Sequence, residues 1–231
     1  MQKKPNNELN PSNKGKKQKL KKNKNRKLSS TNWIKRQVND PYVIEANRLG
    51  YKSRAAFKLL QIDKKFNFLK PGKIVIDLGC APGGWLQVAA KKVYSSEKNI
   101  SVVGVDLLPV SNIYGTKTIV GDINEEDTEK KILNLIDKKP DIILSDMAAN
   151  TTGHKQTDHL RTTQLTEIAL RFAINYLNKG GVFLVKTFRG GSEKTILENM
   201  KKNFSYVKNV KPLASRPESV ESYTICIDLK L

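Results

Sequence analysis

Residues 74–85 read I-V-I-D-L-G-C-A-P-G-G-W, an apolar run that ends on an aspartate and continues into a glycine-rich turn. Short apolar runs bounded by turn residues are typical of strands buried in a parallel sheet. Glycine lets the backbone approach a ligand closely and adopt positive φ without a steric penalty. The stretch therefore predicts a buried strand followed by a ligand-binding turn.

The spacing of the glycines argues against two common nucleotide-binding motifs. No Gly-Lys-Ser/Thr follows the turn, so it is not a phosphate-binding P-loop. Position 81 is alanine, so the turn does not match the dinucleotide motif G-x-G-x-x-G either. The turn thus predicts a closely packed ligand that needs no pyrophosphate site.

Similar apolar runs recur along the chain and predict an α/β fold. Residues 52–66 and 163–177 have helical periodicity, and Ser53 is a candidate N-cap for the first of these helices. Strands with little polar alternation, separated by helices, indicate a mostly parallel sheet with helices on both faces. The predicted strands are residues 74–77, 101–106, 118–120, 141–145, 182–186 and 222–229.

Charged residues end four of these strands, namely Asp77, Asp106, Asp146 and Lys186, and Asp122 follows another apolar run. Ligands of such sheets bind outside the carboxyl ends of the strands. Asp106 lies 29 residues after Asp77, roughly where an acidic residue binds ribose hydroxyls in related folds. A nucleoside without pyrophosphate, held by carboxylates, points to S-adenosylmethionine, whose sulfonium and α-amino groups are both positive.

The charge of the chain is strongly positive and unevenly distributed. The formal net charge is +20 over 231 residues, and residues 1–31 hold eleven Lys/Arg against the single acid Glu8. We predict a disordered basic tail over residues 1–31 and a catalytic domain over residues 32–231. This balance favours nucleic acid over a membrane surface as the partner. The tail is either an arm that tracks a phosphate backbone or a solubilising segment.

Several other classes of protein are disfavoured. The longest apolar stretches are only strand-length, so we expect no membrane span and, without a signal-peptide core or transit pattern, a cytoplasmic location. Cys80 and Cys226 make neither a disulfide framework nor a zinc site, and we expect both to be buried. His154 and His159 lack partners at metal-ligand spacing, so no metal site is predicted.

Four motifs resemble those of the FtsJ/RrmJ family of RNA ribose 2′-O-methyltransferases, in order from about Tyr51 to Leu229. They are D-L-G-C-A-P-G-G-W at 77–85, V-D-L-L-P at 105–109, S-D-M-A at 145–148 and V-K at 185–186. The resemblance implies a Rossmann-like S-adenosylmethionine-dependent methyltransferase fold with a final antiparallel strand. It is strongest to bacterial members, which implies 2′-O-methylation of one uridine ribose in large-subunit ribosomal RNA. By the same resemblance we expect a monomer that acts on the assembled large ribosomal subunit.

The family uses a Lys-Asp-Lys-Glu tetrad, which the resemblance places on Lys58, Asp146, Lys186 and Glu221. Glu218 is a rival for the glutamate. Two positions depart from the family pattern: Ala149 stands where proline is usual, and Arg189 replaces the usual glutamine. The glycine-rich turn, the carboxylates and the resemblance together give the predicted cofactor-binding residues Asp77, Gly79, Pro82, Gly83, Gly84, Trp85, Asp106, Asp122 and Asp146.

The predicted reaction assigns a role to each member of the tetrad. A ribose 2′-hydroxyl must lose its proton as the methyl group transfers, and a lysine can take it only where burial or a neighbouring cation destabilises its ammonium. We therefore expect Lys186 to act as base or orienting group, beside Lys58. Asp146 holds the geometry, and Glu221 orients the second lysine or the hydroxyl. On its own helix, Lys58 reads as a solvated surface lysine off the apolar face.

Two alternatives stay open at this point. A non-catalytic RNA-binding ribosome-assembly factor would explain the charge but not a tetrad beside a cofactor turn. A 2′-O-methyltransferase acting on another RNA would use the same residues. Methylation of a base nitrogen is disfavoured, because S-D-M-A offers no aromatic Pro-Pro-Tyr-type platform.

Overall fold

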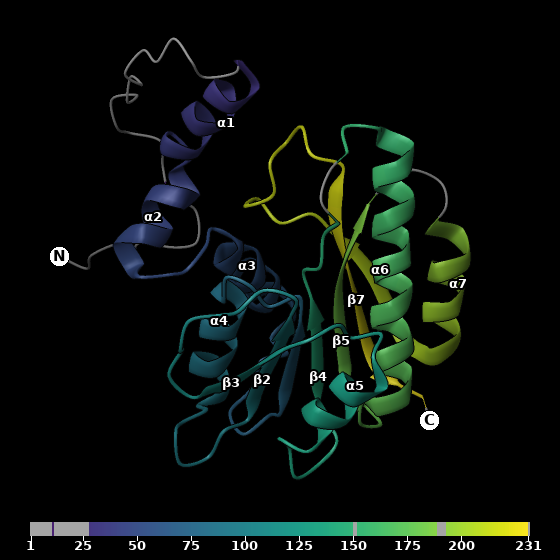
Figure 1. Cartoon of the computed structure of the whole chain (residues 1–231). Coiled ribbons are helices and arrows are strands. Elements are labelled where there is room, and N and C mark those ends of the chain that lie inside the picture. The colour runs from purple at the N-terminus through teal and green to yellow at the C-terminus, as the bar shows by residue number, and fades with distance from the viewer. Residues whose placement is uncertain (1–10, 12–27, 150–151, 189–192, 231) are drawn as a thin grey trace, which may run out of the picture.

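A seven-stranded sheet in the order β3-β2-β1-β4-β5-β7-β6 forms the centre of the structure, a computed structural model that describes residues 11, 28–149, 152–188 and 193–230 (Figure 1). The first five strands are parallel, whereas β7 runs antiparallel to both β5 and β6. The predicted parallel sheet with a final antiparallel strand is thereby confirmed. The strands are β1 Val75–Leu78, β2 Val102–Asp106, β3 Thr116–Val120, β4 Ile142–Ser145, β5 Val182–Phe188, β6 Phe204–Val210 and β7 Glu221–Leu229.

Helices cover both faces of this sheet, as predicted. On one face lie α3 and α4, and on the other lie α5, α6 and α7 (Figure 1). The helices are α1 Leu28–Val38, α2 Pro41–Leu49, α3 Ala55–Phe66, α4 Gly84–Val93, α5 Glu126–Leu133, α6 Lys155–Tyr176 and α7 Glu193–Asn203. No helix in the described ranges is both long and apolar enough to cross a membrane.

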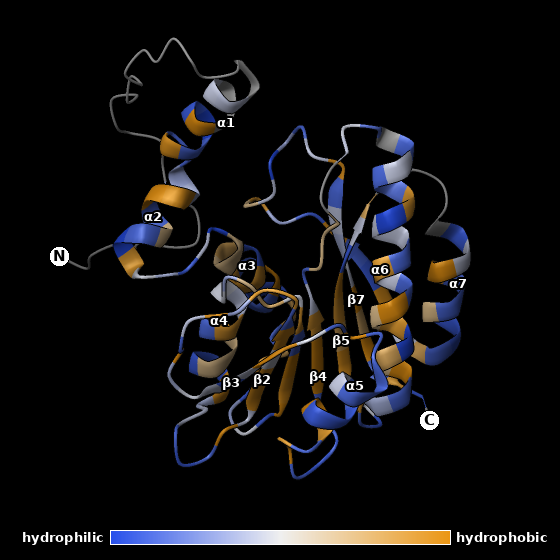
Figure 2. Cartoon of the chain, viewed as in Figure 1, coloured by the Kyte–Doolittle hydropathy of each residue, from blue (hydrophilic) through white to orange (hydrophobic). Residues whose placement is uncertain are grey.

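The central strands are apolar at every position because both of their faces are buried. Val75 and Val102 pack towards α3 and α4, while their neighbours Ile76 and Val103 pack towards the opposite layer. All four side chains are fully buried, and each contributes roughly 1.5–3 kcal/mol of hydrophobic stabilisation. Figure 2 shows the result as a hydrophobic sheet enclosed by helices with polar outer surfaces.

The structure corrects several predicted boundaries. Asp77 does not end its strand, since β1 continues to Leu78. Ser53 is not the N-cap of α3: Arg54 occupies that position without a side-chain cap, and the Ser53 hydroxyl lies against Gly84 at the start of α4. The helix predicted at 163–177 begins earlier, at Lys155.

Several elements have no predicted range, namely β6 and the helices α1, α2, α4, α5 and α7. β6 is an edge strand with mostly exposed side chains, so it lacks the apolar run that marks the central strands. The helices α1 and α2 precede the first motif, and α1 includes residues 28–31, which the sequence analysis assigned to the basic tail. Apart from residue 11, the rest of that tail lies outside the described residues.

The second of these helices, α2, has well-formed ends and a defined packing partner. Asp40 is its N-cap and accepts a hydrogen bond from the Tyr42 backbone N–H at 3.0 Å, while Gly50 closes it in the left-handed conformation. Ala46 packs with Phe57 of α3 in a small buried cluster. α2 thus packs against α3, the helix that carries Lys58.

Candidate active site

A cleft lies at the carboxyl ends of β1, β2, β3 and β4, on either side of the point where strand order reverses. Its cavity volume is ≈ 360 Å³, large enough for a nucleoside. Such a position is the usual one for ligands of doubly wound sheets. The cleft is lined by Gly79, Ala81, residues 105–108, residues 121–124, residues 146–148 and Leu165.

Two of the predicted carboxylates are held at the wall of this cleft by backbone N–H groups. Asp106 accepts hydrogen bonds from the Ala81 N–H at 2.8 Å and the Leu108 N–H at 2.9 Å. Asp122 accepts from both the backbone and the side-chain nitrogen of Asn124, at 2.9 and 3.0 Å. A carboxylate has further lone pairs, so both groups can still accept hydrogen bonds from ligand hydroxyls or amines.

Asp77 is fully buried, and neither of its carboxylate oxygens has a hydrogen-bond partner among the described residues. Burial, and then the negative charges of Asp146 and Asp106, raise the pKa of Asp77 well above its ordinary value. An unpartnered buried carboxylate is costly, and a cationic ligand group would offset that cost. Asp77 does not itself line the cleft, whereas Asp106, Asp122 and Asp146 do. This acidic end of the site fits S-adenosylmethionine, which carries a sulfonium and an ammonium.

The glycines of the turn are required by close packing within the chain. A Cβ on Gly79 (φ 76°) would lie 2.4 Å from Met147 Cγ, and one on Gly83 (φ 109°) would lie 2.3 Å from Ile113 Cδ1. Gly83 is also the N-cap of α4. The predicted need for glycine is thus explained by contacts with neighbouring loops of the protein, while only Gly79 of the three turn glycines lines the cleft.

Pro82 and Trp85 shape the turn without lining the cleft. Pro82 is exposed, whereas Trp85 is buried and its indole N–H donates to the Ala55 carbonyl at 2.8 Å. The indole ring also lies 5.7 Å from the Tyr223 ring, centroid to centroid. Trp85 therefore packs against Tyr223, a residue that contacts the tetrad.

All four members of the predicted tetrad come together, although they belong to four separate segments. Lys58 lies on α3, Asp146 follows β4, Lys186 lies on β5 and Glu221 begins β7. Lys186 Nζ lies 2.8 Å from Asp146 Oδ1 and also donates to the Asp146 carbonyl at 2.8 Å. Both lysines are buried, with exposed fractions of 8% and 6%, so the reading of Lys58 as a solvated surface lysine is wrong.

The glutamate pairs mainly with the first lysine. Glu221 Oε1 lies 2.7 Å from Lys58 Nζ, whereas the nearest contact of Glu221 with Lys186 is 3.8 Å. Ser215 donates its hydroxyl to Glu221 Oε1 at 2.9 Å. The rival Glu218 is exposed on the preceding loop, so the structure places Glu221, and not Glu218, within the cluster.

Tyr223 joins the two halves of the cluster, a role that sequence reasoning missed. Its hydroxyl accepts a hydrogen bond from Lys58 Nζ at 2.9 Å and donates one to Asp146 Oδ1 at 2.7 Å. Burial, followed by the charges of Asp146 and Glu221, raises the pKa of Tyr223 well above its ordinary value. The phenol therefore stays protonated. No local sequence signal marks this role, because Tyr223 is placed opposite Lys186 only by the pairing of β5 with β7.

The electrostatics keep Asp146 ionised. Burial disfavours its charged form, but Lys186, Lys58 and the two side-chain hydrogen bonds outweigh that effect and hold the pKa of Asp146 below its ordinary value. The cluster thus contains two ammonium groups and two carboxylates in close contact. Such a buried set is costly to leave incomplete.

Other predicted features are placed more simply. Cys80 and Cys226 are both buried and free, as expected. Arg189 lies outside the described residues, and Ala149 is half-buried beyond the end of β4. Among the described side chains, no group of three or more His, Cys, Asp or Glu could hold a metal ion.

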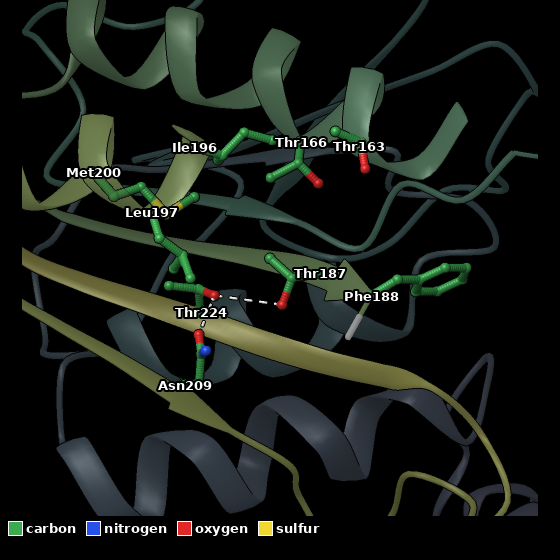
Figure 3. Close-up of a pocket in the computed structure, with 9 residues that line it drawn as sticks. All are labelled: Thr163, Thr166, Thr187, Phe188, Ile196, Leu197, Met200, Asn209 and Thr224. Atoms are coloured by element: carbon green, nitrogen blue, oxygen red, sulfur yellow. Dashed lines mark hydrogen bonds between the residues drawn. The ribbon is translucent and has the colours of Figure 1, made fainter. Parts of the chain in front are cut away.

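Another cavity lies on the face of the sheet that α6 and α7 cover, between these helices and the strands β5–β7 (Figure 3). Its volume is ≈ 10 Å³, too small for a cofactor. Thr224 joins its polar side, contacting the Thr187 hydroxyl at 3.3 Å and Asn209 Oδ1 at 2.6 Å. This cavity therefore cannot hold the cofactor, whereas the cleft at the strand ends carries Asp106, Asp122 and Asp146 on its wall.

Comparison with known proteins gives a consistent result. The sequence pattern of the FtsJ-like methyltransferase family matches residues 51–229. The chain is 50% identical over 204 residues to the Ribosomal RNA large subunit methyltransferase E of Bartonella quintana, covering 88% of this chain and 85% of that protein. It is 51% identical over 209 residues to the protein of the same name from Paramagnetospirillum magneticum, covering 90% and 86%.

A solved structure supports the fold. The crystal structure of a Plasmodium falciparum chain, described as a ribosomal RNA methyltransferase, superposes with a TM-score of 0.68 at 34% identity. The superposition covers 78% of this chain and 98% of that one. The family match also confirms the prediction of S-adenosylmethionine as the methyl donor. From the match over most of its length and from these relatives, the chain belongs to the FtsJ-like methyltransferase family.

Proposed function

We propose that the protein methylates the 2′-hydroxyl of a uridine ribose in large-subunit ribosomal RNA, on the assembled subunit. One observation carries this proposal: Asp146 belongs to both the cofactor cleft and the tetrad. Its backbone and side chain therefore bring the methyl donor next to Lys186. The names of the relatives, which are large-subunit ribosomal RNA methyltransferases, support the choice of RNA.

The tetrad residues orient the acceptor and receive its proton. S-adenosylmethionine, held in the cleft beside Asp106, Asp122 and Asp146, would supply an activated methyl group for transfer to the ribose oxygen. Lys186, fixed by two contacts with Asp146, is in position to orient the hydroxyl. To act as base, its ammonium must first release a proton to solvent, after which the free amine takes the hydroxyl proton and becomes an ammonium again. Glu221 holds Lys58, and Tyr223 links that pair to Asp146.

Orientation carries more of the rate than proton removal. General-base assistance contributes about 10²–10⁴-fold, whereas holding an activated donor against its acceptor can supply roughly 7–11 kcal/mol. The structure favours a large contribution from orientation, because the tetrad residues lie on or next to strands of the sheet and on a buried helix face.

The experiment uses radiolabelled S-adenosylmethionine and large ribosomal subunits from a methyltransferase-deficient strain, with Lys186→Ala in parallel. The RNA is then digested to nucleosides. Label in 2′-O-methyluridine that is lost in the variant supports the proposal. Label on a base contradicts it, and cofactor and subunit binding without label points instead to a non-catalytic assembly factor or to another RNA.

We further propose that the enzyme works as a monomer, in the cytoplasm where ribosomal subunits mature. Residues 1–31, with their excess of lysine, serve as an RNA-tracking arm attached to a catalytic domain that spans the remaining residues. A comparison of the full chain with a chain lacking residues 1–27, at several salt concentrations, tests the contribution of this arm to RNA binding.

A further inference from the structure

Two arginines share one carboxylate beside the tetrad. Arg54 Nη1 lies 2.9 Å from Asp40 Oδ2, and Arg216 Nη2 lies 3.5 Å from the same oxygen. The three residues come from the N-cap of α2, the start of α3 and the loop between β6 and β7. One positive charge is left in excess. Burial, partly opposed by Asp40, lowers the pKa of Arg54, and Arg216 lowers it further.

This cluster is connected directly to the tetrad. Arg54 precedes Lys58 by one helical turn and donates to the Ala214 carbonyl. The next residue, Ser215, hydrogen-bonds Glu221, which in turn holds Lys58. The Arg216 side chain is 27% exposed, so one guanidinium can be reached from solvent at the edge of the active site.

We propose that Arg54 and Arg216 form a phosphate-binding site for the RNA backbone next to the nucleotide that is methylated, an inference that rests on the proposed function. Guanidinium groups bind phosphate through paired, charge-assisted hydrogen bonds. The Arg54 side chain is 17% exposed, so part of its guanidinium reaches the surface beside Arg216; its buried Nε has no hydrogen-bond partner among the described residues. Asp40 Oδ2 contacts both guanidinium groups and therefore competes with an RNA phosphate for them.

Asp40 offers an unusual test because its two oxygens have different roles. Oδ1 caps α2, whereas Oδ2 faces the arginines. Asparagine is also a good N-cap, so Asp40→Asn keeps the helix end and removes only the competing negative charge. The proposal predicts that this variant binds RNA more tightly than the wild-type protein.

The central experiment measures methyl transfer to large subunits from a methyltransferase-deficient strain, at several KCl concentrations. Arg216→Gln is expected to raise KM for the subunit several-fold at low salt and leave kcat and the Kd of S-adenosylmethionine within about twofold. The slope of log(kcat/KM) against log[KCl] should become shallower by about 0.7–0.9, as for the loss of one phosphate contact. Arg216→Lys keeps the charge and should keep the slope.

The matched control is Arg171→Gln. Arg171 lies on α6, on the opposite face of the sheet, in a weak contact of 3.9 Å with Glu129. The control makes the same charge change away from the tetrad and should leave the slope unchanged. Equal slopes for Arg216→Gln and Arg171→Gln, or loss of RNA affinity in Asp40→Asn, would overturn the proposal.

A binding measurement separates this inference from the proposed function. Fluorescence anisotropy with a labelled single-stranded oligouridylate needs no methyl transfer. If the wild-type protein does not methylate the subunit, but Arg216→Gln still has a shallower salt slope for oligouridylate binding than the wild type, then the phosphate site is supported and only the proposed reaction is contradicted. If the wild-type protein methylates the subunit, but the salt slopes of wild type and Arg216→Gln are equal, then the proposed reaction is supported and the phosphate site is contradicted.

Discussion

The Tyr223 hydroxyl donates a 2.7 Å hydrogen bond to Asp146 and thereby ties the first lysine of the tetrad to the carboxylate that holds the second. Without this phenol, the Lys58–Glu221 pair and the Lys186–Asp146 pair would be joined only through the 3.8 Å contact of Glu221 with Lys186. Tyr223 is fully buried and packed against Trp85. It is therefore well placed to act as a positioning residue.

Tyr223→Phe should lower kcat about 10- to 100-fold, because hydrogen bonds to charged groups contribute roughly 1.5–3 kcal/mol. Tyr223 does not line the cofactor cleft, so the Kd of S-adenosylmethionine should stay within about twofold. The pH–rate profile should also shift, since the phenol contacts two charged groups of the tetrad. Steady-state kinetics over pH and calorimetric cofactor titration check this; an unchanged kcat and profile would reduce Tyr223 to a packing role.

Lys186→Met should abolish most of the activity, with kcat reduced by at least about 10². The variant leaves Asp146 without its main partner, which typically costs about 3–5 kcal/mol of unfolding free energy. Urea unfolding measures that loss. The double variant Lys186→Met/Asp146→Asn should recover part of the stability while remaining inactive; recovery of activity would show that neither residue takes part in catalysis.

The same ion pair predicts a pH dependence of stability. The pKa of Asp146 is held below its ordinary value in the folded protein. Its contribution to stability is therefore present above the pKa of the unfolded chain and is lost as pH falls through the lower folded value. In Lys186→Met the folded pKa of Asp146 should rise, because burial is then opposed by fewer favourable contacts. The acid loss of stability from this group should therefore become smaller or reverse, which thermal unfolding of both proteins between about pH 3 and pH 6 can detect.

Asp77→Asn should have opposite effects on stability and on cofactor binding. The pKa of Asp77 is raised in the fold, so ionising it destabilises the free protein as pH rises above the unfolded value near 3.9. Removing the charge should raise Tm at neutral pH and weaken S-adenosylmethionine binding. Wild-type protein should release protons on binding the cofactor, seen by calorimetry in two buffers of different ionisation enthalpy. A lower Tm together with unchanged affinity would contradict this account.

The sequence was most informative where burial is complete on both sides of the sheet. The central strands of the sheet, such as β1 and β4, carry apolar runs because both faces are covered. Asp77, one residue before the end of β1, and Asp146, directly after β4, lie at the same edge of the sheet. β6 gave no such signal, since Ser205 and Lys208 are exposed on an edge strand. The sheet could be predicted, but its last edge could not.

The contacts within the site depended on tertiary structure that no local pattern encodes. Lys58 and Glu221 are 163 residues apart in the chain, and only the packing of α3 beside β7 brings them together. The role of Tyr223 likewise follows from its pairing with Lys186 across two antiparallel strands. The family resemblance could suggest the tetrad residues but not which of them pair.

Glu221 and Glu218 can be compared directly, because Glu221→Gln and Glu218→Gln make the same chemical change three residues apart. Glu221 contacts both tetrad lysines, whereas Glu218 is exposed three residues earlier. Glu221→Gln keeps the shape and removes the charge that pairs with Lys58, so kcat should fall about tenfold or more, in line with a lost charge-assisted hydrogen bond. Glu218→Gln should change the unfolding free energy by no more than about 0.5 kcal/mol, as for most surface changes. Its kcat should stay within about twofold of the wild-type value. Methyl-transfer assays on both variants at equal cofactor saturation decide the matter, and a larger loss in Glu218→Gln would mean that the loop rearranges when RNA binds.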